Sequence, residues 1–202
     1  MKLNTKLSSL AVSSILTIVS LTGVANAAVL ITIDLSVVNK VTMTATTGLS
    51  DVTASGSDTT GIYFENFYST PGNSLSAIFD TGNITNVENP SDGTPALFRA
   101  GGGADPGLNL WSWSSDATVT FTAGSQAFTG SATWNLTPAA YLDMVNGNTT
   151  GNIYFPADSV DDISGLAVLG TYSVAAVAVP EPSSTFLPSC GVLGLVFKRS
   201  RR

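Results

Sequence analysis

Residues 117–136 read ATVTFTAGSQAFTGSATWNL, and this stretch decides the predicted fold. On both sides of Gly124-Ser125, apolar side chains alternate with small polar ones, which is the period of a strand with one buried face. A two-residue loop with glycine in first position favours a type II′ turn. The stretch is therefore predicted to form a β-hairpin. Its predicted opposed pairs are Phe121 with Phe128, Ala117 with Ala132, Thr120 with Thr129, and Thr118 with Ser131.

The same period recurs through the chain. The odd positions from Val29 to Val37 are apolar, and Val41, Met43 and Ala45 repeat the pattern against threonines. Further predicted strands are Ile62–Tyr68, Leu75–Phe79 and about Leu166–Val177. One short helix is expected over Ala139–Val145, with Thr137 as N-cap, Pro138 in the first turn and Asn146-Gly147 at its end. The glycine-rich loop Gly101–Gly107 is expected to be mobile.

Several short strands with turn signals and no βαβ alternation predict an all-β protein. We expect a single β-sandwich domain of jelly-roll type over residues 28–178. It is flanked by an N-terminal signal-peptide helix in residues 1–27 and by a C-terminal segment, residues 179–202, with a short hydrophobic helix.

The N-terminal segment has the order of a secretory signal peptide. Lys2 and Lys6 are followed by the apolar run Leu10–Val24. The small residues Ala25 and Ala27 then predict cleavage by signal peptidase directly before Ala28.

The C-terminal segment has three parts in a fixed order. The first is an extended, proline-flanked element, the second a short apolar run, and the third a basic cluster that favours the cytoplasmic side of a membrane. The first part is Pro180-Glu181-Pro182-Ser183. The apolar residues are Phe186, Leu187, Val192, Leu193, Leu195, Val196 and Phe197. The basic residues are Lys198, Arg199, Arg201 and Arg202.

This arrangement resembles the PEP-CTERM sorting signal, and the resemblance covers only about the last 24 residues. It implies export through the inner membrane, transient membrane retention, recognition by an exosortase-like transpeptidase, and delivery to the cell surface or extracellular matrix. Residues 186–197 would span only about 18 Å as a helix, against about 30 Å of hydrocarbon, so retention is expected to be brief.

Charge and composition exclude several functions. Six of the eight basic residues lie in the two terminal segments, which leaves two basic against 14 acidic residues in Ala28–Glu181, a net charge of −12. Nucleic acid is therefore excluded as a partner. Histidine is absent, and Cys190 is the single cysteine, which rules out histidine-dependent triads and thiolate zinc sites in the domain.

Few residues suggest chemistry within the domain. Trp111 and Trp113 lie two apart on a predicted strand and therefore share a face, either as core or as a stacking platform for sugar rings. Asp80-Thr81-Gly82 resembles the active-site signature of aspartic proteases, but it also suits a turn after a strand. Asp158, Asp161 and Asp162 could hold Ca²⁺, with solvated acidic loops as the alternative. No other cofactor or metal is expected.

The sequence thus predicts a non-enzymatic exported protein that an exosortase-like enzyme sorts to the cell surface or extracellular matrix. A carbohydrate-binding module with extracellular polysaccharide as partner is the first alternative. A carboxylate-dependent hydrolase, either a dimeric aspartic protease or a glycosidase, is the second.

Overall fold

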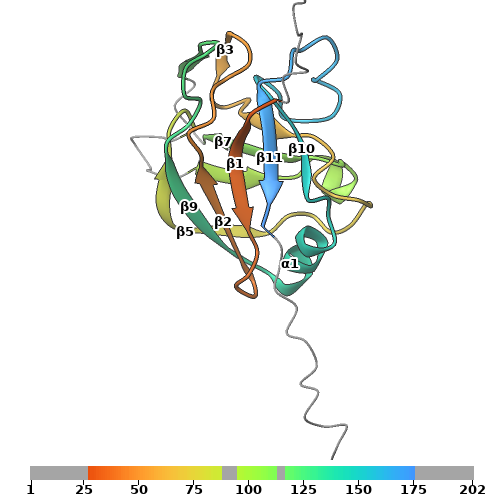
Figure 1. Cartoon of the computed structure of the whole chain (residues 1–202). Coiled ribbons are helices and arrows are strands. Elements are labelled where there is room, and N and C mark those ends of the chain that lie inside the picture. The colour runs from red at the N-terminus through yellow and green to blue at the C-terminus, as the bar shows by residue number, and fades with distance from the viewer. Residues whose placement is uncertain (1–26, 88–94, 113–116, 176–202) are drawn as a thin grey trace, which may run out of the picture.

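The computed structural model describes residues 27–87, 95–112 and 117–175, which form a body built mainly of strands (Figure 1). The predicted dominance of β-structure is confirmed. The strands are β1 (Val29–Asp34), β2 (Lys40–Ala45), β3 (Ala54–Ser57), β4 (Ile62–Phe64), β5 (Ala77–Ile84), β6 (Pro95–Phe98), β7 (Leu108–Ser112), β8 (Thr118–Phe121), β9 (Gly130–Leu136), β10 (Thr150–Tyr154) and β11 (Gly170–Val174). The helical elements are η1 (Gly101–Gly103) and α1 (Pro138–Val145).

Nine strands form one curled sheet in the order β5-β9-β2-β1-β11-β10-β4-β7-β6. All neighbours in it are antiparallel except β1 and β11, which run parallel. The edge strands β5 and β6 approach each other, so the sheet nearly closes. Across this closure, Nε1 of Trp134 in β9 donates a hydrogen bond to the carbonyl of Pro95 in β6 at 3.0 Å. β3 and β8 form a separate two-stranded sheet.

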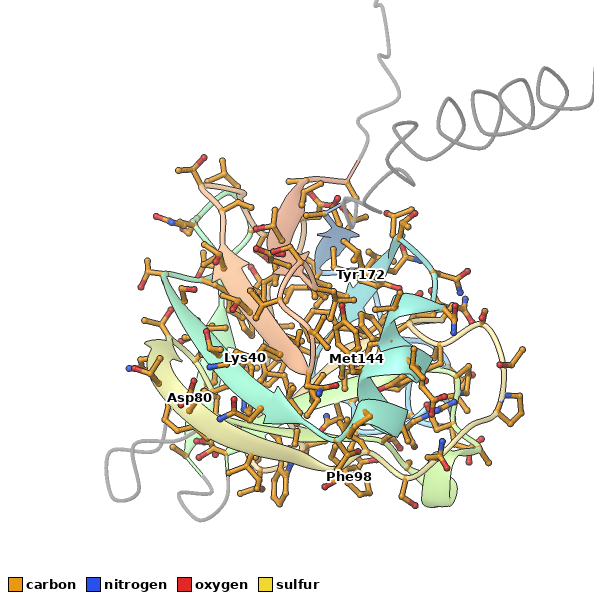
Figure 2. All side chains as sticks on the ribbon, turned by 90° about the horizontal axis from the view of Figure 1, so that it is seen from below. Lys40, Asp80, Phe98, Met144 and Tyr172 are labelled. Atoms are coloured by element: carbon orange, nitrogen blue, oxygen red, sulfur yellow. The ribbon has the colours of Figure 1, made fainter. Side chains whose placement is uncertain are left out.

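Aromatic and aliphatic side chains fill the interior of the curled sheet. Trp134, Phe64 and Tyr172 are completely or almost completely buried there. Met144 of α1 and Tyr172 of β11, both labelled in Figure 2, belong to this core. Fully burying a large apolar side chain contributes about 1.5–3 kcal/mol, so this interior is the main source of the body's stability.

β1 follows the predicted alternation, with one correction. Ile31 and Ile33 are buried as expected. Val29 is 39 % exposed, because the pairing of β1 with β11 is irregular between Val29 and Ile31, and Leu30 is buried instead. Val37 lies beyond the end of β1 and is 57 % exposed. A bulge therefore shifts the buried parity within this short strand.

β2 and β9 show the regular two-faced pattern most clearly. On the inner face Val41 lies opposite Trp134, and both are buried. On the outer face the Thr42 and Thr133 hydroxyls lie 2.9 Å apart. The alternation that predicted these strands therefore separates a dry face from a hydrogen-bonded one.

Three predicted strands exist with different bounds. Ile62–Tyr68 is a strand only over Ile62–Phe64, and Leu75–Phe79 becomes β5 at Ala77–Ile84. Of Leu166–Val177, the described part up to residue 175 is a strand over Gly170–Val174. The predicted helix is confirmed. The hydroxyl of Thr137 accepts a hydrogen bond from the Ala140 amide at 3.4 Å, and Pro138 begins α1. Among the described residues, no helix has the length and hydrophobicity to cross a membrane.

The predicted hairpin is wrong. β8 pairs with β3, whereas β9 lies between β2 and β5. Residues 124–127, between the two strands, bond instead to residues 48–50, with the Gly124 amide 2.9 Å from the Ser50 carbonyl. Phe121 and Phe128 nevertheless meet, with ring centroids 5.2 Å apart, because both are buried in the core.

The turn itself also differs from the prediction. The Ser125 amide donates to the Thr122 carbonyl at 3.0 Å, so Gly124 occupies the third position of the turn rather than the second. Its φ of 77° is the left-handed value that type II turns require there. Gly130, with a φ of 94°, then begins β9. Glycine adopts both positive φ values without strain, and the chain between them bonds to residues 48–50 rather than returning along β8.

The first and last described residues flank the neighbouring strands β1 and β11. The Thr171 amide donates to the carbonyl of Ala28 at 2.8 Å, and the Ala175 amide donates to the carbonyl of Ile33 at 2.7 Å. Because β1 and β11 run parallel, residue 27 and residue 175 lie at opposite poles of the body (Figure 1). The predicted signal-peptide helix and C-terminal hydrophobic helix lie outside the described residues.

Candidate functional site

Most residues predicted to carry sorting fall outside the described part of the chain. This holds for the Pro-Glu-Pro element, the apolar run, the basic cluster and Ala25. Of the predicted cleavage site, Ala27 and Ala28 are described. The hydroxyl of Thr171 lies within 3.3 Å of the Ala27 carbonyl and 3.1 Å of the Ala28 carbonyl. Ala28 is the first described residue that forms a backbone–backbone hydrogen bond with β11, and the predicted cut falls directly before it.

Of the three tryptophans of the chain, among which Trp111 and Trp113 were predicted as a platform, the two described ones lie in different surroundings. Trp134 is 1 % exposed and belongs to the core. Trp111 lies on the outer face of β7, opposite to Leu108 and Leu110, and is half-buried. Of the two alternatives for Trp111, core or platform, the position on the outer face excludes the central core. β8, with the buried Phe121, is not a continuation of β7 but belongs to the other sheet. Trp113 lies outside the described residues.

A row of side chains crosses this outer face over four strands. Phe98, Asn109, Tyr63 and Tyr154 lie opposite one another on β6, β7, β4 and β10. Residues 157–168 pack over the Tyr63 and Tyr154 end of the row through Ala157 and its apolar neighbours. At the Phe98 end of the row, a hollow lies between β6, β7 and the start of the covering segment.

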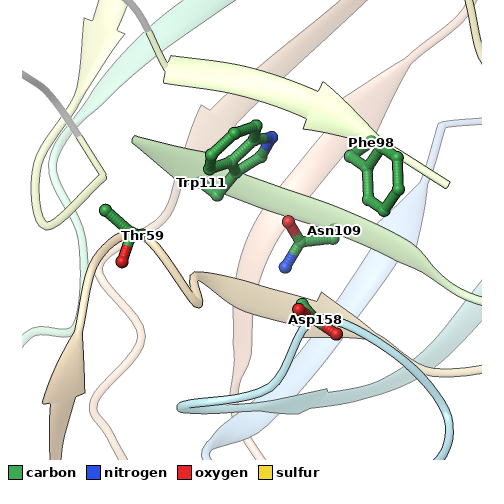
Figure 3. A pocket seen from close by; sticks show the side chains of 5 residues that line it. All are labelled: Thr59, Phe98, Asn109, Trp111 and Asp158. Carbon is green, nitrogen blue, oxygen red and sulfur yellow. The ribbon is translucent and has the colours of Figure 1, made fainter. Parts of the chain in front are cut away.

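We name this depression the Trp111 hollow (Figure 3). Its volume is about 200 Å³. Phe98 and Trp111 come from neighbouring strands, and Ala96, the residue opposite Trp111, is small enough to leave space beside the indole. Figure 3 shows the Asn109 amide between the two rings and Asp158 on the facing segment. The lining residues are Thr59, Phe98, Asn109, Trp111 and Asp158.

Asn109 braces the floor of the hollow. It is 2 % exposed, and its Nδ2 donates to the carbonyls of Thr60 at 2.9 Å and Ala157 at 3.0 Å. Gly61 allows this close approach, since a Cβ there would lie 2.5 Å from the Leu110 carbonyl and 2.6 Å from the Trp111 Cβ. One amide thus ties β7 to the chain before β4 and to the covering segment.

The buried carboxylate of Asp105 supports the covering segment as well. Oδ1 of Asp105 accepts hydrogen bonds from the Tyr63 hydroxyl and the Gly107 amide, both at 2.6 Å, and Oδ2 accepts from the Val160 amide at 2.9 Å. Burial, together with the Asp105 carboxylate, raises the pKa of Tyr63, which therefore stays protonated and donates. The 101–107 loop was expected to be mobile, but these bonds and the η1 turn hold it in place.

Arg99 anchors the same loop from the opposite side. Its side chain is almost fully buried, and its guanidinium carbon lies 3.7 Å from the centroid of the Tyr68 ring. Nε donates to the Asp105 carbonyl at 2.8 Å, and Nη2 donates to the Thr70 carbonyl at 2.9 Å. The carboxylate of Asp143 lies 3.9 Å from Nη1. The charge is thus compensated within the fold, and Arg99 acts as a structural residue.

The acidic residues proposed for calcium form a hydrogen-bonded turn. The Asp158 amide donates to Oδ2 of Asp162 at 3.2 Å. Burial and the neighbouring Asp162 raise the pKa of Asp158, whereas hydrogen bonds from Asp158 lower the pKa of Asp162. Within the described residues, no group of three or more acidic side chains is placed to hold a metal ion. Asp158 instead faces the Trp111 hollow.

Asp80 does not have the surroundings of a protease carboxylate. It lies within β5 at a bulge between Phe79 and Thr81, so the turn expected for Asp-Thr-Gly is also wrong. Its Oδ2 accepts a hydrogen bond from the Lys40 ammonium at 2.7 Å on the exposed surface (Figure 2). The bond and charge of Lys40 lower the pKa of Asp80. Asp80 therefore forms an exposed ion pair between β5 and β2.

Phe98 and Asn109 were not singled out in the sequence, and Asp158 was assigned a different role. The hollow depends on the pairing of β6 with β7 and on a segment some fifty residues further along the chain. Comparisons with protein-family models, with curated proteins and with solved structures find no match to this chain.

Proposed function

We propose that this protein is a non-enzymatic, exported β-sandwich protein that an exosortase-like transpeptidase sorts to the cell surface or extracellular matrix. The observation that carries the proposal is the pair of terminal signals. A secretory signal ending at Ala27 brings the chain across the inner membrane, and the Pro180-Glu181-Pro182 element is then available on the far side. The sorting element can be processed only after the secretory signal has brought the chain across the inner membrane, so the two signals support each other.

The described body is compatible with processing at both ends. The predicted cut before Ala28 leaves β1 and its bonds to β11 intact. At the opposite pole, only residues 176–179 separate the last strand-bonded residue from Pro180. The apolar run begins at Phe186, so residues 176–185 form the tether to the membrane. Ten residues reach at most about 36 Å, so the body stays within that distance of the membrane until the tail is removed.

The assignment of the β-rich body as a jelly-roll-like sandwich is part of the same proposal. A jelly-roll-like sandwich has two layers that face each other across one core. The bond from Trp134 in β9 to Pro95 in β6, and the approach of β5 to β6, support two such layers within the curled sheet.

Substitutions in the sorting element test the proposal in the native host. Glu181→Ala should leave the protein in the membrane fraction with its tail uncleaved, whereas the unchanged protein is released in shortened form. Ser184→Ala, just beyond the element, is the matched control and should be released normally. Equal release and shortening of the Glu181→Ala and unchanged proteins would contradict the proposal.

A further inference from the structure

The Trp111 hollow combines aromatic faces with polar groups in a way that points to a ligand. Phe98 is 46 % exposed and is the one aromatic side chain among the exposed large hydrophobic residues of the described segments. It lies beside half-buried Trp111 on the outer face of β6 and β7, with the Asn109 amide oxygen on the side of the two rings (Figure 3). Apolar ring faces beside hydrogen-bonding groups match the two surfaces of a sugar ring, its C–H face and its hydroxyls.

We propose that the Trp111 hollow binds one neutral pyranose ring of an oligosaccharide or polysaccharide. The ring lies against Trp111 and Phe98, and Asp158 accepts a hydrogen bond from one of its hydroxyls. This binding goes beyond sorting and does not depend on it.

Size and charge select this ligand class. The volume of about 200 Å³ is below the roughly 300–1,000 Å³ typical of sites for drug-sized molecules, so the hollow takes a single ring and leaves the rest of a chain outside. Among the described residues of the lining, Asp158 is the charged one, and neither Lys40 nor Arg99 contributes to it. An acidic sugar would therefore meet a carboxylate without a compensating cation.

The hollow is held in its shape before any ligand arrives. Asn109 binds both rims through the Thr60 and Ala157 carbonyls, and Asp105 holds the facing segment through the Val160 amide. Because buried hydrogen bonds already fix this framework, fewer side chains and loops have to be ordered when a ligand binds, which lowers the entropic cost of binding. This preorganisation distinguishes Phe98 from the scattered aliphatic residues exposed elsewhere, such as Ile78 on β5.

Calorimetric titration of the full-length protein tests the proposal. The probes are neutral oligosaccharides of glucose, galactose and mannose in α and β linkage, an oligomer of uronic acids, and tetramethylammonium chloride, which tests for a cation-binding aromatic cage. We expect at least one neutral series to bind. Phe98→Ala should weaken that binding about tenfold, and Asp158→Ala should weaken it about fivefold.

Matched variants separate the hollow from the surface in general. Ile78→Ala removes a more exposed apolar side chain from β5, and Asp161→Ala removes a neighbouring carboxylate outside the hollow. Both should bind as tightly as the unchanged protein. Circular dichroism of Phe98→Ala checks that the fold is retained, which is expected because Phe98 is exposed. The proposal is overturned if no neutral series binds, if Phe98→Ala binds unchanged, or if tetramethylammonium or the uronic acid oligomer binds more tightly.

Discussion

The two halves of the curled sheet are stabilised in different ways. In β1, β2, β9 and β5, apolar side chains face inward and hydroxyl side chains pair on the surface, as with Val41 opposite Trp134 and Thr42 beside Thr133. In β4, β7 and the loops around them, polar side chains are themselves buried, among them Asp105, Arg99 and Asn109. Both halves contribute apolar side chains to the same core, but the second half also contains buried polar side chains that are held by hydrogen bonds.

The difference shows where a binding site can be built. A pattern of apolar inner residues and hydroxyl outer residues leaves little relief on the surface, because short outer side chains such as Thr42 and Thr133 hydrogen-bond to each other. Buried polar groups can instead fix a loop against the outer face of the sheet, and the Trp111 hollow lies where such a loop meets the sheet. Such networks rigidify only when every member is satisfied. The comparison therefore predicts opposite responses to conservative substitutions in the two halves.

The largest effect is expected in the first half of the sheet. Trp134→Ala should lower the free energy of unfolding by about 4 kcal/mol, because it empties the centre of the core and removes the bond to Pro95. Met43→Leu, a volume-conserving change in the same layer, should cost less than about 1.5 kcal/mol. Urea unfolding measures both. A Met43→Leu cost as large as that of Trp134→Ala would show that this half does not depend on volume alone.

The next largest effect is expected in the second half, among its hydrogen-bonded polar side chains. Tyr63→Phe keeps almost the full side-chain volume but removes the donor to Asp105, and it should lower the free energy of unfolding by about 1–3 kcal/mol. Tyr68→Phe is the matched control, since the buried Tyr68 hydroxyl has no hydrogen-bond partner among the described residues. It should be neutral or slightly stabilising. Equal costs for both variants in urea unfolding would contradict the role of the Asp105 network.

The smallest effect concerns Asp158 at the rim of the hollow. Its pKa is raised in the folded protein, so protonation stabilises the fold below the ordinary aspartate value of 3.8, and this contribution is lost as the pH rises through the raised pKa. Asp158→Asn carries no charge and should be a few tenths of a kcal/mol more stable at neutral pH, a small gain because the side chain is largely exposed.

The pH dependence provides the check on this variant. Thermal unfolding of the Asp158→Asn and unchanged proteins should differ at neutral pH and converge below about pH 3.8. A difference that grows as the pH falls would contradict the sign of the shift. Asp161→Asn, for the neighbouring residue on the same segment, serves as control.

Local sequence patterns correctly predicted those structural features that depend on residues close together in the chain. The cap at Thr137 and the first-turn Pro138 placed α1 correctly, because capping involves residues a few positions apart. The alternation in β1 and β2 identified the buried residues except at Val29, where a bulge shifts the parity, and at Val37, which lies beyond the end of β1. Strand partners could not be predicted in the same way. Phe121 lies opposite Ala54 rather than Phe128, and nothing within residues 117–136 specifies that distant partner.

The hollow was beyond prediction for the same reason. The sequence drew attention to Trp111, either as core or as a stacking platform, and to Asp158 as a calcium ligand. Their actual neighbourhood depends on β6 pairing with β7 and on Asn109 binding the Ala157 carbonyl, 48 positions away. Phe98 had no distinguishing signal, because an aromatic residue near a strand end is ordinarily part of a core.

The most direct test of the sorting account is the intact mass of the protein recovered from its native host. We predict a mature chain that begins at Ala28 and ends near Pro180-Glu181-Pro182. Such a product would have lost both terminal segments and kept the whole described body. Recovery of chains that retain Arg202 would contradict the account.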